Sequence, residues 1–258
     1  MLNSTKAGVT SLDVLNRQIV ACERCPRLAE YRRQIAVIKR RAYLDQEYWG
    51  KPVPSFGDPA ARLLIVGLAP GAHGANRTGR MFTGDRSGDY LYRSLYRAGF
   101  ASQPGSLNAS DGLRLTDARI TAAAHCAPPD NKPTPEELGT CRSWLERELD
   151  LLTDLRVVVV LGKIALDAYL SILRTRGEVA RLADYRFGHN ILYPLRPVLL
   201  CSYHPSQQNT STGKLTQEML DAIFVRAAQL IESDVSQSAP VPAAPPPSSR
   251  PSSASRKR

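Results

Sequence analysis

The sequence predicts an α/β fold, a three-layer α/β/α sandwich with a central four-stranded parallel sheet. Four short apolar runs are rich in β-branched residues and have the length of buried strands. Segments with apolar residues at helical spacing alternate with these runs, and such alternation produces a parallel sheet covered by helices on both faces. The predicted strands are residues 63–67, 119–124, 156–161 and 198–202.

The helical period of 3.6 residues recurs in five segments, one of which also has a clear start signal. Thr134 is the predicted cap of that helix, Pro135 occupies its first position and Glu137 completes a capping box. This start places Cys141 two turns into the helix, on its apolar stripe. The predicted helices are residues 12–21, 89–98, 134–153, 164–173 and 216–231.

Composition divides the chain into one folded domain, residues 1–231, and a tail, residues 232–258. The tail is rich in Pro, Ser and Ala with a basic end, and is predicted to be disordered because it cannot bury a core. The whole chain carries +10, and the tail, with four basic and two acidic residues, carries +2, which leaves +8 on the domain. Such a folded body suits a polyanionic partner.

Neither a targeting segment nor a membrane segment is predicted. Residues 1–17 lack the apolar core of a signal peptide, and no apolar run approaches the ~20 residues that a membrane span needs. We therefore expect a cytoplasmic protein that does not bind a membrane. Five cysteines in such a reducing compartment argue against disulfide bonds and favour a metal site.

Four of the cysteines form two pairs that suit a metal. Two residues separate Cys22 from Cys25 in a Cys-x-x-Cys motif, and Cys126 and Cys141 follow much later in the chain. Four thiolates can close a tetrahedral site around Zn or hold an iron–sulfur cluster, and the spacing does not choose between them. Cys201 lies in a predicted strand, where a buried inert thiol is expected.

Three candidate functional loops follow the ends of predicted strands, where open parallel sheets bind their ligands. The first, residues 67–85, is rich in glycine, which allows a close approach of backbone amides to a ligand. It is not a nucleotide-binding P-loop, because Arg80 and Met81 stand where that motif requires Lys and then Ser or Thr.

The other two loops are residues 125–133 and 203–209. The second joins a cysteine to Asn131, whose amide is able to read the edge of a base. The third begins Tyr203-His204, and the sequence offers no matching acidic partner for a hydrolase triad around this histidine.

Taken together, the loops resemble the uracil-DNA glycosylase superfamily, and most closely its iron–sulfur type 5 branch, uracil-DNA glycosylase B. The resemblance extends from about residue 22 to residue 230 and includes cysteines at the cluster spacing of that branch. The matching motifs are Gly67-Leu-Ala-Pro-Gly71 with Thr78-Gly-Arg-Met-Phe-Thr-Gly-Asp85, Cys126-Ala-Pro-Pro-Asp-Asn-Lys-Pro133, and His204-Pro-Ser-Gln-Gln-Asn209.

The resemblance implies a monofunctional glycosylase of DNA base-excision repair. Such enzymes flip a damaged nucleotide into a pocket and hydrolyse its N-glycosidic bond. Type 5 enzymes accept hypoxanthine and other damaged bases besides uracil. The expected partner is double- or single-stranded DNA that contains such a base. We expect the protein to act as a monomer at the bacterial nucleoid. The implied cofactor is a 4Fe-4S cluster on Cys22, Cys25, Cys126 and Cys141.

The same resemblance suggests roles for site residues. Phe82 matches the aromatic that stacks on the base, and His204 matches the histidine that donates to uracil O2. Asp85 is our candidate for positioning water or stabilising the sugar cation, with helix capping as its alternative. Asn131 is the candidate base reader. Further substrate-binding candidates are Gly67, Ala69, Gly71, Ser206 and Asn209.

Departures from the family pattern predict loose base selectivity. Leu68 and Ala69 are apolar where better-known branches carry a water-positioning carboxylate or amide, and Ala122 stands where type 4 enzymes have the asparagine that reads uracil. A pocket with fewer polar readers discriminates less between bases.

Two assignments remain open on the sequence. Leu215 is a candidate DNA wedge with Lys214 on a phosphate, but Leu215 is equally suited to be the first core residue of the last helix. A DNA-binding iron–sulfur redox sensor without catalysis is the alternative function, favoured by the apolar Leu68 and Ala69. A plain zinc staple is the alternative for the metal.

Overall fold

The computed structural model describes residues 9–238 of the chain. The predicted tail lies mostly outside the described residues; the last described element, helix α8 (Gln217–Ser238), continues past the predicted domain end at residue 231. No helix in this described range is long and apolar enough to cross a membrane.

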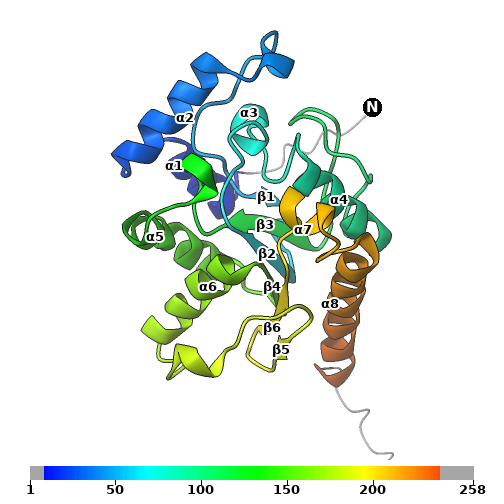
Figure 1. Ribbon diagram of the computed structural model, residues 1–258. Helices are drawn as coiled ribbons and strands as arrows, with labels where there is room; N and C mark the ends of the chain where they lie inside the picture. The colour runs from blue at the N-terminus through cyan, green and yellow to red at the C-terminus, as the bar shows by residue number, and fades with distance from the viewer. Residues whose placement is uncertain (1–8, 239–258) are drawn as a thin grey trace, which may run out of the picture.

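A six-stranded sheet in the order β1-β3-β2-β4-β6-β5 forms the middle layer (Figure 1). The predicted four-stranded sheet is therefore corrected: its four parallel strands are present, but two antiparallel strands extend the edges. Two-residue strands have no periodicity to detect, and only pairing with a sheet edge creates them. The strands are β1 (Phe56–Gly57), β2 (Leu63–Gly67), β3 (Ala118–Ala122), β4 (Val157–Leu161), β5 (Leu192–Tyr193) and β6 (Val198–Ser202).

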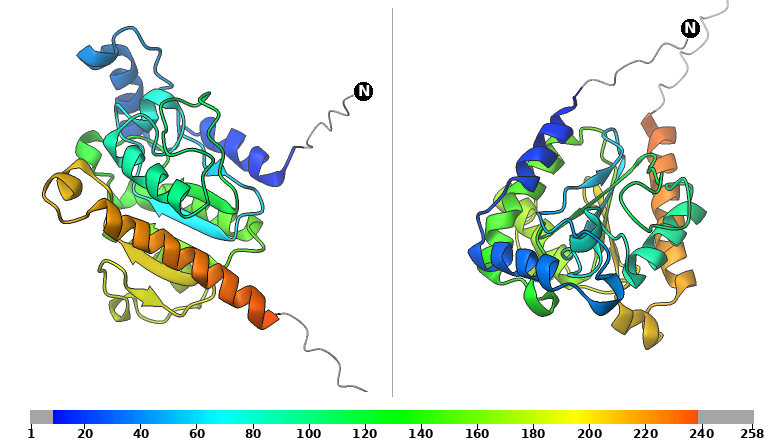
Figure 2. Two further views of the ribbon diagram at one scale, coloured as in Figure 1. Left: turned by 90° about the vertical axis from the view of Figure 1, so that its right-hand side faces the viewer. Right: turned by 90° about the horizontal axis from the view of Figure 1, so that it is seen from above.

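Helices cover both faces of the sheet, as the predicted sandwich requires (Figure 2). Successive side chains of a strand point to opposite faces. Leu63 and Ile65 of β2 belong to the core under α4 and α8, whereas Leu64 and Val66 belong to the core under α1, α5 and α6. These helices are α1 (Ser11–Val20), α4 (Arg86–Arg97), α5 (Pro135–Leu151), α6 (Lys163–Thr175) and α8.

The remaining helices are short or weakly amphipathic. Helix α2 (Pro26–Ile38) is not among the predicted helices, because it buries only Leu28, Ala29 and Arg32 and so has little apolar period. Two short helices lie in the predicted functional loops, and three single 3-10 turns complete the list: α3 (Ala75–Thr78), α7 (Gln207–Ser211), η1 (Arg41–Tyr43), η2 (Pro129–Asn131) and η3 (Leu182–Asp184).

Parallel pairing brings the predicted loops together. Strand β2 pairs in parallel with both β3 and β4, and β4 pairs in parallel with β6. The carboxyl ends of all four strands therefore lie at the same end of the sheet. The loops that leave this edge are residues 67–85, 123–134 and 203–206. The fold thus places the three motifs at the carboxyl end of the sheet, although they are far apart in the sequence.

A buried ion pair fixes β3 to α5. Arg119 Nε donates to Glu148 Oε1 at 2.6 Å, and Ser55 Oγ donates to the other carboxylate oxygen at 2.8 Å. The two charged side chains are almost completely buried. Removing one partner of such a pair leaves the other charge in the core without compensation.

We expect Glu148→Ala to lower the free energy of unfolding by about 3–5 kcal/mol, because it leaves the Arg119 guanidinium buried and unpaired. Urea unfolding followed by circular dichroism measures this loss. Asp150→Ala is the matched control on the same helix, since Asp150 is 64% exposed in its ion pair with Arg176 and should change stability by less than about 1 kcal/mol. Equal losses for the two variants would contradict the structural role of the pair.

Candidate active site and cysteine pocket

The ring of Phe82 lies against the end of β2. A Cβ atom on Gly67 would stand 2.8 Å from two ring carbons of Phe82, so glycine is required for this close approach. The ring centroids of Phe82 and His204 are 5.7 Å apart and tilted by 31°. Phe82 and His204, from the loops after β2 and β6, therefore lie close together at the carboxyl end of the sheet.

Phe82 is held in an unfavourable backbone conformation by polar contacts of its neighbours. Its φ is +52°, in the left-handed region that bulky residues avoid. Tyr92 Oη donates to the Met81 carbonyl at 2.7 Å, and Arg80 Nε donates to Thr83 Oγ1 at 2.9 Å. Strain of this kind persists where surrounding structure enforces it, and it clusters at functional sites.

The two carboxylate oxygens of Asp85 have different surroundings. Oδ1 accepts from the Gly88 amide at 3.1 Å and caps α4, so the capping alternative for Asp85 is confirmed. Oδ2 faces the glycine-rich loop, where Cβ atoms built on Gly71 and Gly74 would lie 3.0 and 2.0 Å away. Burial raises the pKa of Asp85, against smaller opposing effects of its hydrogen bonds and Arg77. Because Oδ1 caps the helix, Oδ2 is the oxygen that faces Gly71 and Gly74.

The His204 ring is neutral near pH 7. Burial lowers its pKa to about 4, and no hydrogen bond joins this ring to another residue in the part of the chain that the structure describes. A neutral imidazole carries one N–H donor and one acceptor. His204 can therefore offer a hydrogen bond to a ligand without a positive charge.

Two other predicted substrate contacts support the His204 loop itself. Asn209 Nδ2 donates to the His204 carbonyl at 2.8 Å. Ser206 Oγ accepts from the Asn209 amide at 3.3 Å and caps α7. These bonds fix the backbone that positions the histidine; direct contact of either side chain with substrate stays a prediction.

The other predicted loop residues differ in exposure. Asn131 is exposed at the end of η2 with φ +56°, so a base would have to meet its amide at the surface. Ala69 and Gly71, within the glycine-rich loop, are half-buried. Lys214 is exposed, with Nζ 4.9 Å from the centre of the Tyr203 ring.

Leu215 occupies the core position that was the alternative to a DNA wedge. Its side chain is 0% exposed and belongs to the same hydrophobic core as Leu220 and Phe224. A wedge must leave the protein surface and enter the base stack, and Leu215 would have to abandon this core to do so. We correct its assignment to a core residue.

A network around His73 and Arg77 was not foreseen from the sequence. Tyr48 Oη lies 3.0 Å from His73 Nδ1. Arg77 donates to the carbonyl oxygens of His73 at 2.8 Å and Gly84 at 2.7 Å, which ties the middle of the glycine-rich loop to its C-terminal end. Burial, with the nearby Arg40 and Arg77, lowers the pKa of His73. No local pattern signals these contacts, because Tyr48 comes from another segment.

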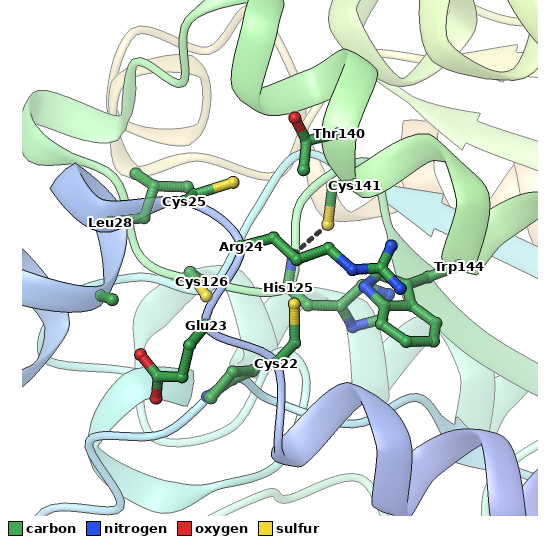
Figure 3. A pocket seen from close by; sticks show the side chains of 12 residues that line it. Cys22, Glu23, Arg24, Cys25, Leu28, His125, Cys126, Thr140, Cys141 and Trp144 are labelled. Carbon is green, nitrogen blue, oxygen red and sulfur yellow. Dashed lines mark hydrogen bonds between the residues drawn. The ribbon is translucent and has the colours of Figure 1, made fainter.

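Four cysteines line one pocket, which we call the cysteine pocket (Figure 3). Cys22 follows α1, Cys25 precedes α2, Cys126 lies in the loop after β3 and Cys141 lies on α5. The cavity between them has a volume of about 20 Å³. Cys201 lies elsewhere, buried on β6.

The cysteine sulfurs have polar neighbours. The His125 amide donates to Cys141 Sγ at 3.4 Å. The guanidinium of the buried Arg32 acts on the pKa of Cys126 in the direction opposite to burial. Burial raises the pKa of Cys126 to about 11 and that of Cys141 to about 12, so a metal would bind in exchange for protons. Among residues 9–238, no three potential ligand side chains converge as the ligands of one metal ion would.

Comparison with known proteins identifies the family. The family described as "Uracil DNA glycosylase superfamily" matches residues 54–228. The type-5 uracil-DNA glycosylase of Mycobacterium leprae is 52% identical over 226 residues, which cover 86% of this chain and 97% of that protein. The chain belongs to the uracil-DNA glycosylase superfamily. The family resemblance predicted from the motifs is thereby confirmed.

Within the superfamily, the chain is more similar to type-5 than to type-4 relatives. The type-5 uracil-DNA glycosylase of Thermus thermophilus is 51% identical, over 82% of this chain and 94% of that protein. The type-4 uracil-DNA glycosylase of Archaeoglobus fulgidus is 28% identical, over 76% of this chain and 82% of that protein.

We expect Asp85→Asn to stabilise the protein at pH 7, because asparagine keeps the cap and removes a buried charge. A raised carboxyl pKa favours the neutral form in the folded state. Wild-type stability should therefore fall as pH rises from the unfolded-state pKa to the folded-state pKa, and the advantage of the variant should be larger at pH 7 than at pH 4. Urea unfolding at both pH values measures it.

Asp13→Asn is the opposite control. Hydrogen bonds to Thr10 lower the pKa of Asp13, which completes the capping box of α1. Its ionised form is favoured in the folded state, so Asp13→Asn should lose stability at pH 7 and much less at pH 3. If Asp85→Asn also lost stability at pH 7, the claim that burial raises the pKa of Asp85 would be wrong.

Proposed function

We propose that this chain is a monofunctional glycosylase of DNA base-excision repair, which hydrolyses the N-glycosidic bond of uracil and of hypoxanthine and other deaminated or damaged bases. The observation that carries the proposal is the approach of the Phe82 and His204 rings at the carboxyl end of the sheet, with Asp85 three residues after Phe82 on the same loop. The type-5 uracil-DNA glycosylases to which the chain is 52% identical support it.

In the proposed mechanism, a flipped base stacks on Phe82 while His204 donates to a carbonyl oxygen such as uracil O2. The C1′–N bond breaks with its electron pair leaving on the base, so this donor becomes more favourable as negative charge develops. A neutral His204, with its pKa near 4, supplies the donor over the whole neutral range.

Asp85 is the proposed water-positioning group. Its Oδ2 faces the glycine-rich loop rather than the helix that Oδ1 caps. Water attacks C1′ with its oxygen and gives its proton to Asp85, and the raised pKa makes this carboxylate a better base than an exposed aspartate. The matched motifs hold one lysine, Lys132, which is exposed, so we assign no amine nucleophile.

The proposed breadth of substrates follows from the apolar residues near the end of β2. Leu68 and Ala69 follow the strand, and Ala122, which is buried, ends β3. None of the three offers a side-chain hydrogen bond to distinguish bases. Selection would then rest on stacking and on the donor of His204, with Asn131 as a candidate reader at the surface.

The proposed partner is DNA, single- or double-stranded, containing a damaged base. The +8 charge of the domain supports binding to a phosphate backbone. A monomer that acts at the bacterial nucleoid is the setting we propose for this activity.

For the cysteine pocket we propose a 4Fe-4S cluster held by Cys22, Cys25, Cys126 and Cys141. Four thiols around one pocket are a suitable donor set. A single Zn would need all four sulfurs about 2.3 Å from one point, whereas in a 4Fe-4S cluster each thiolate binds a different iron atom. The cluster would join α1 and α2 to α5; hydrolysis requires no electron from it.

We expect the purified protein to cleave uracil and hypoxanthine from labelled oligonucleotides without Mg²⁺, as shown by alkali-dependent strand breaks. His204→Ala should lower the rate by about 10²–10³-fold, and Asp85→Asn by at least about 10²-fold, while both variants still bind DNA. Binding of DNA without cleavage of either base by the wild type would favour the redox-sensor alternative. Full activity of Asp85→Asn would leave Asp85 as a helix cap only.

We expect Cys25→Ser and Cys141→Ser to lose visible absorbance and the equal amounts of iron and sulfide of the anaerobically purified wild type. Cys201→Ser is the matched control and should keep both, because Cys201 lies on β6 away from the cysteine pocket. Stoichiometric zinc without iron in the wild type would instead establish the zinc staple.

A further inference from the structure

A buried arginine lies beside the cysteine pocket. Helix α2 buries three side chains, those of Leu28, Ala29 and Arg32. Arg32 follows the other two by four and three residues, so all three lie on one face of the helix. Leu28 and Ala29 line the cysteine pocket, and the face of α2 that carries Arg32 is therefore turned toward the four thiols.

Two of the three guanidinium nitrogens of Arg32 have partners. Nη1 donates to the Gly50 carbonyl at 2.6 Å, and Nη2 donates to Glu23, which lies between Cys22 and Cys25 in the sequence. Nε is buried, and no hydrogen bond joins it to another group in the described part of the chain. Because buried N–H donors almost always have an acceptor, Nε is suited to donate to a group bound in the cysteine pocket.

The positive charge of Arg32 acts on one thiol of this pocket. It opposes the larger effect of burial on the pKa of Cys126, as a guanidinium close to that sulfur would. Arg33 pairs with the same Glu23 carboxylate, but its side chain is 59% exposed. Of the two arginines, the buried one is therefore placed to interact with the cysteine ligands.

We propose that Arg32 is a positioning residue of the metal site, whose Nε–H donates to the Cys126 sulfur when the 4Fe-4S cluster is bound. The inference rests on the cluster proposed for the cysteine pocket. Because Nη2 holds Glu23, the same side chain also orders the loop that carries Cys22 and Cys25.

The proposed contact has two consequences for the cluster. Four thiolates give a 4Fe-4S cluster a net negative charge, and reduction makes that charge more negative. Hydrogen bonds to the sulfurs and nearby charge set its reduction potential. A buried cation next to Cys126 therefore favours the reduced form, and it also favours retention of the cluster.

The test measures the midpoint potential of the cluster and the rate of iron loss to a chelator, in anaerobically purified full-length protein. Arg32→Gln removes the charge, so it should shift the potential to a more negative value and speed iron loss by about 10-fold or more. Arg32→Lys keeps the charge without the Nε–H and should lie between the wild type and Arg32→Gln in both measurements. Arg33→Gln is the matched control, with the same Glu23 partner, and should change neither.

The potential separates this role from a purely structural one, which would alter stability alone. An unchanged potential in Arg32→Gln, or an equal shift in Arg33→Gln, would overturn the role of Arg32 and leave the cluster proposal intact. If Arg32→Gln is purified without a cluster, Arg32→Lys is compared with the wild type, and equal potentials would overturn the inference. Zinc without iron in the wild type would overturn the cluster itself, and uracil cleavage by that protein would still support the glycosylase proposal.

Discussion

Burial of both faces of the parallel sheet is the constraint on which the rest of the structure depends. Strand β2 is buried along its whole length, with Leu63 and Ile65 in one core and Leu64 and Val66 in the other. Helices must then cover both faces, and each connection between parallel strands must cross back over the sheet. The carboxyl ends of the parallel strands therefore lie together, which is why motifs separated by more than a hundred residues lie side by side.

Polar contacts give this edge its detailed shape. The buried Arg80 pairs with Asp111 and also donates to Thr83, so one charge orders both the Phe82 segment and the turn from Leu107 to Asp111. Isolated buried charges are costly, but these are paired and hydrogen-bonded. The left-handed φ of Phe82 is maintained by this surrounding network. The backbone conformation of Phe82 thus depends on the ion pair between Arg80 and Asp111.

The cysteine pocket lies where the N-terminal helices meet the rest of the domain. Helix α2 buries few side chains, and its buried Arg32 must pair with Glu23 and donate to the Gly50 carbonyl. An arm with so little apolar burial gains from a covalent or metal connection to the body of the domain. In the proposed cluster, Cys141 on α5 would bind from the body of the domain.

The sequence by itself determined the parallel core of the sheet, five of its covering helices and the identity of the motifs, because periodicity, caps and turn residues are local signals. The capping box at Thr134 is present as expected. Only the tertiary structure decided the two edge strands, helix α2 and the burial of Leu215. Whether a leucine is buried depends on which elements pack over it, and a local pattern holds no record of residues distant in the chain.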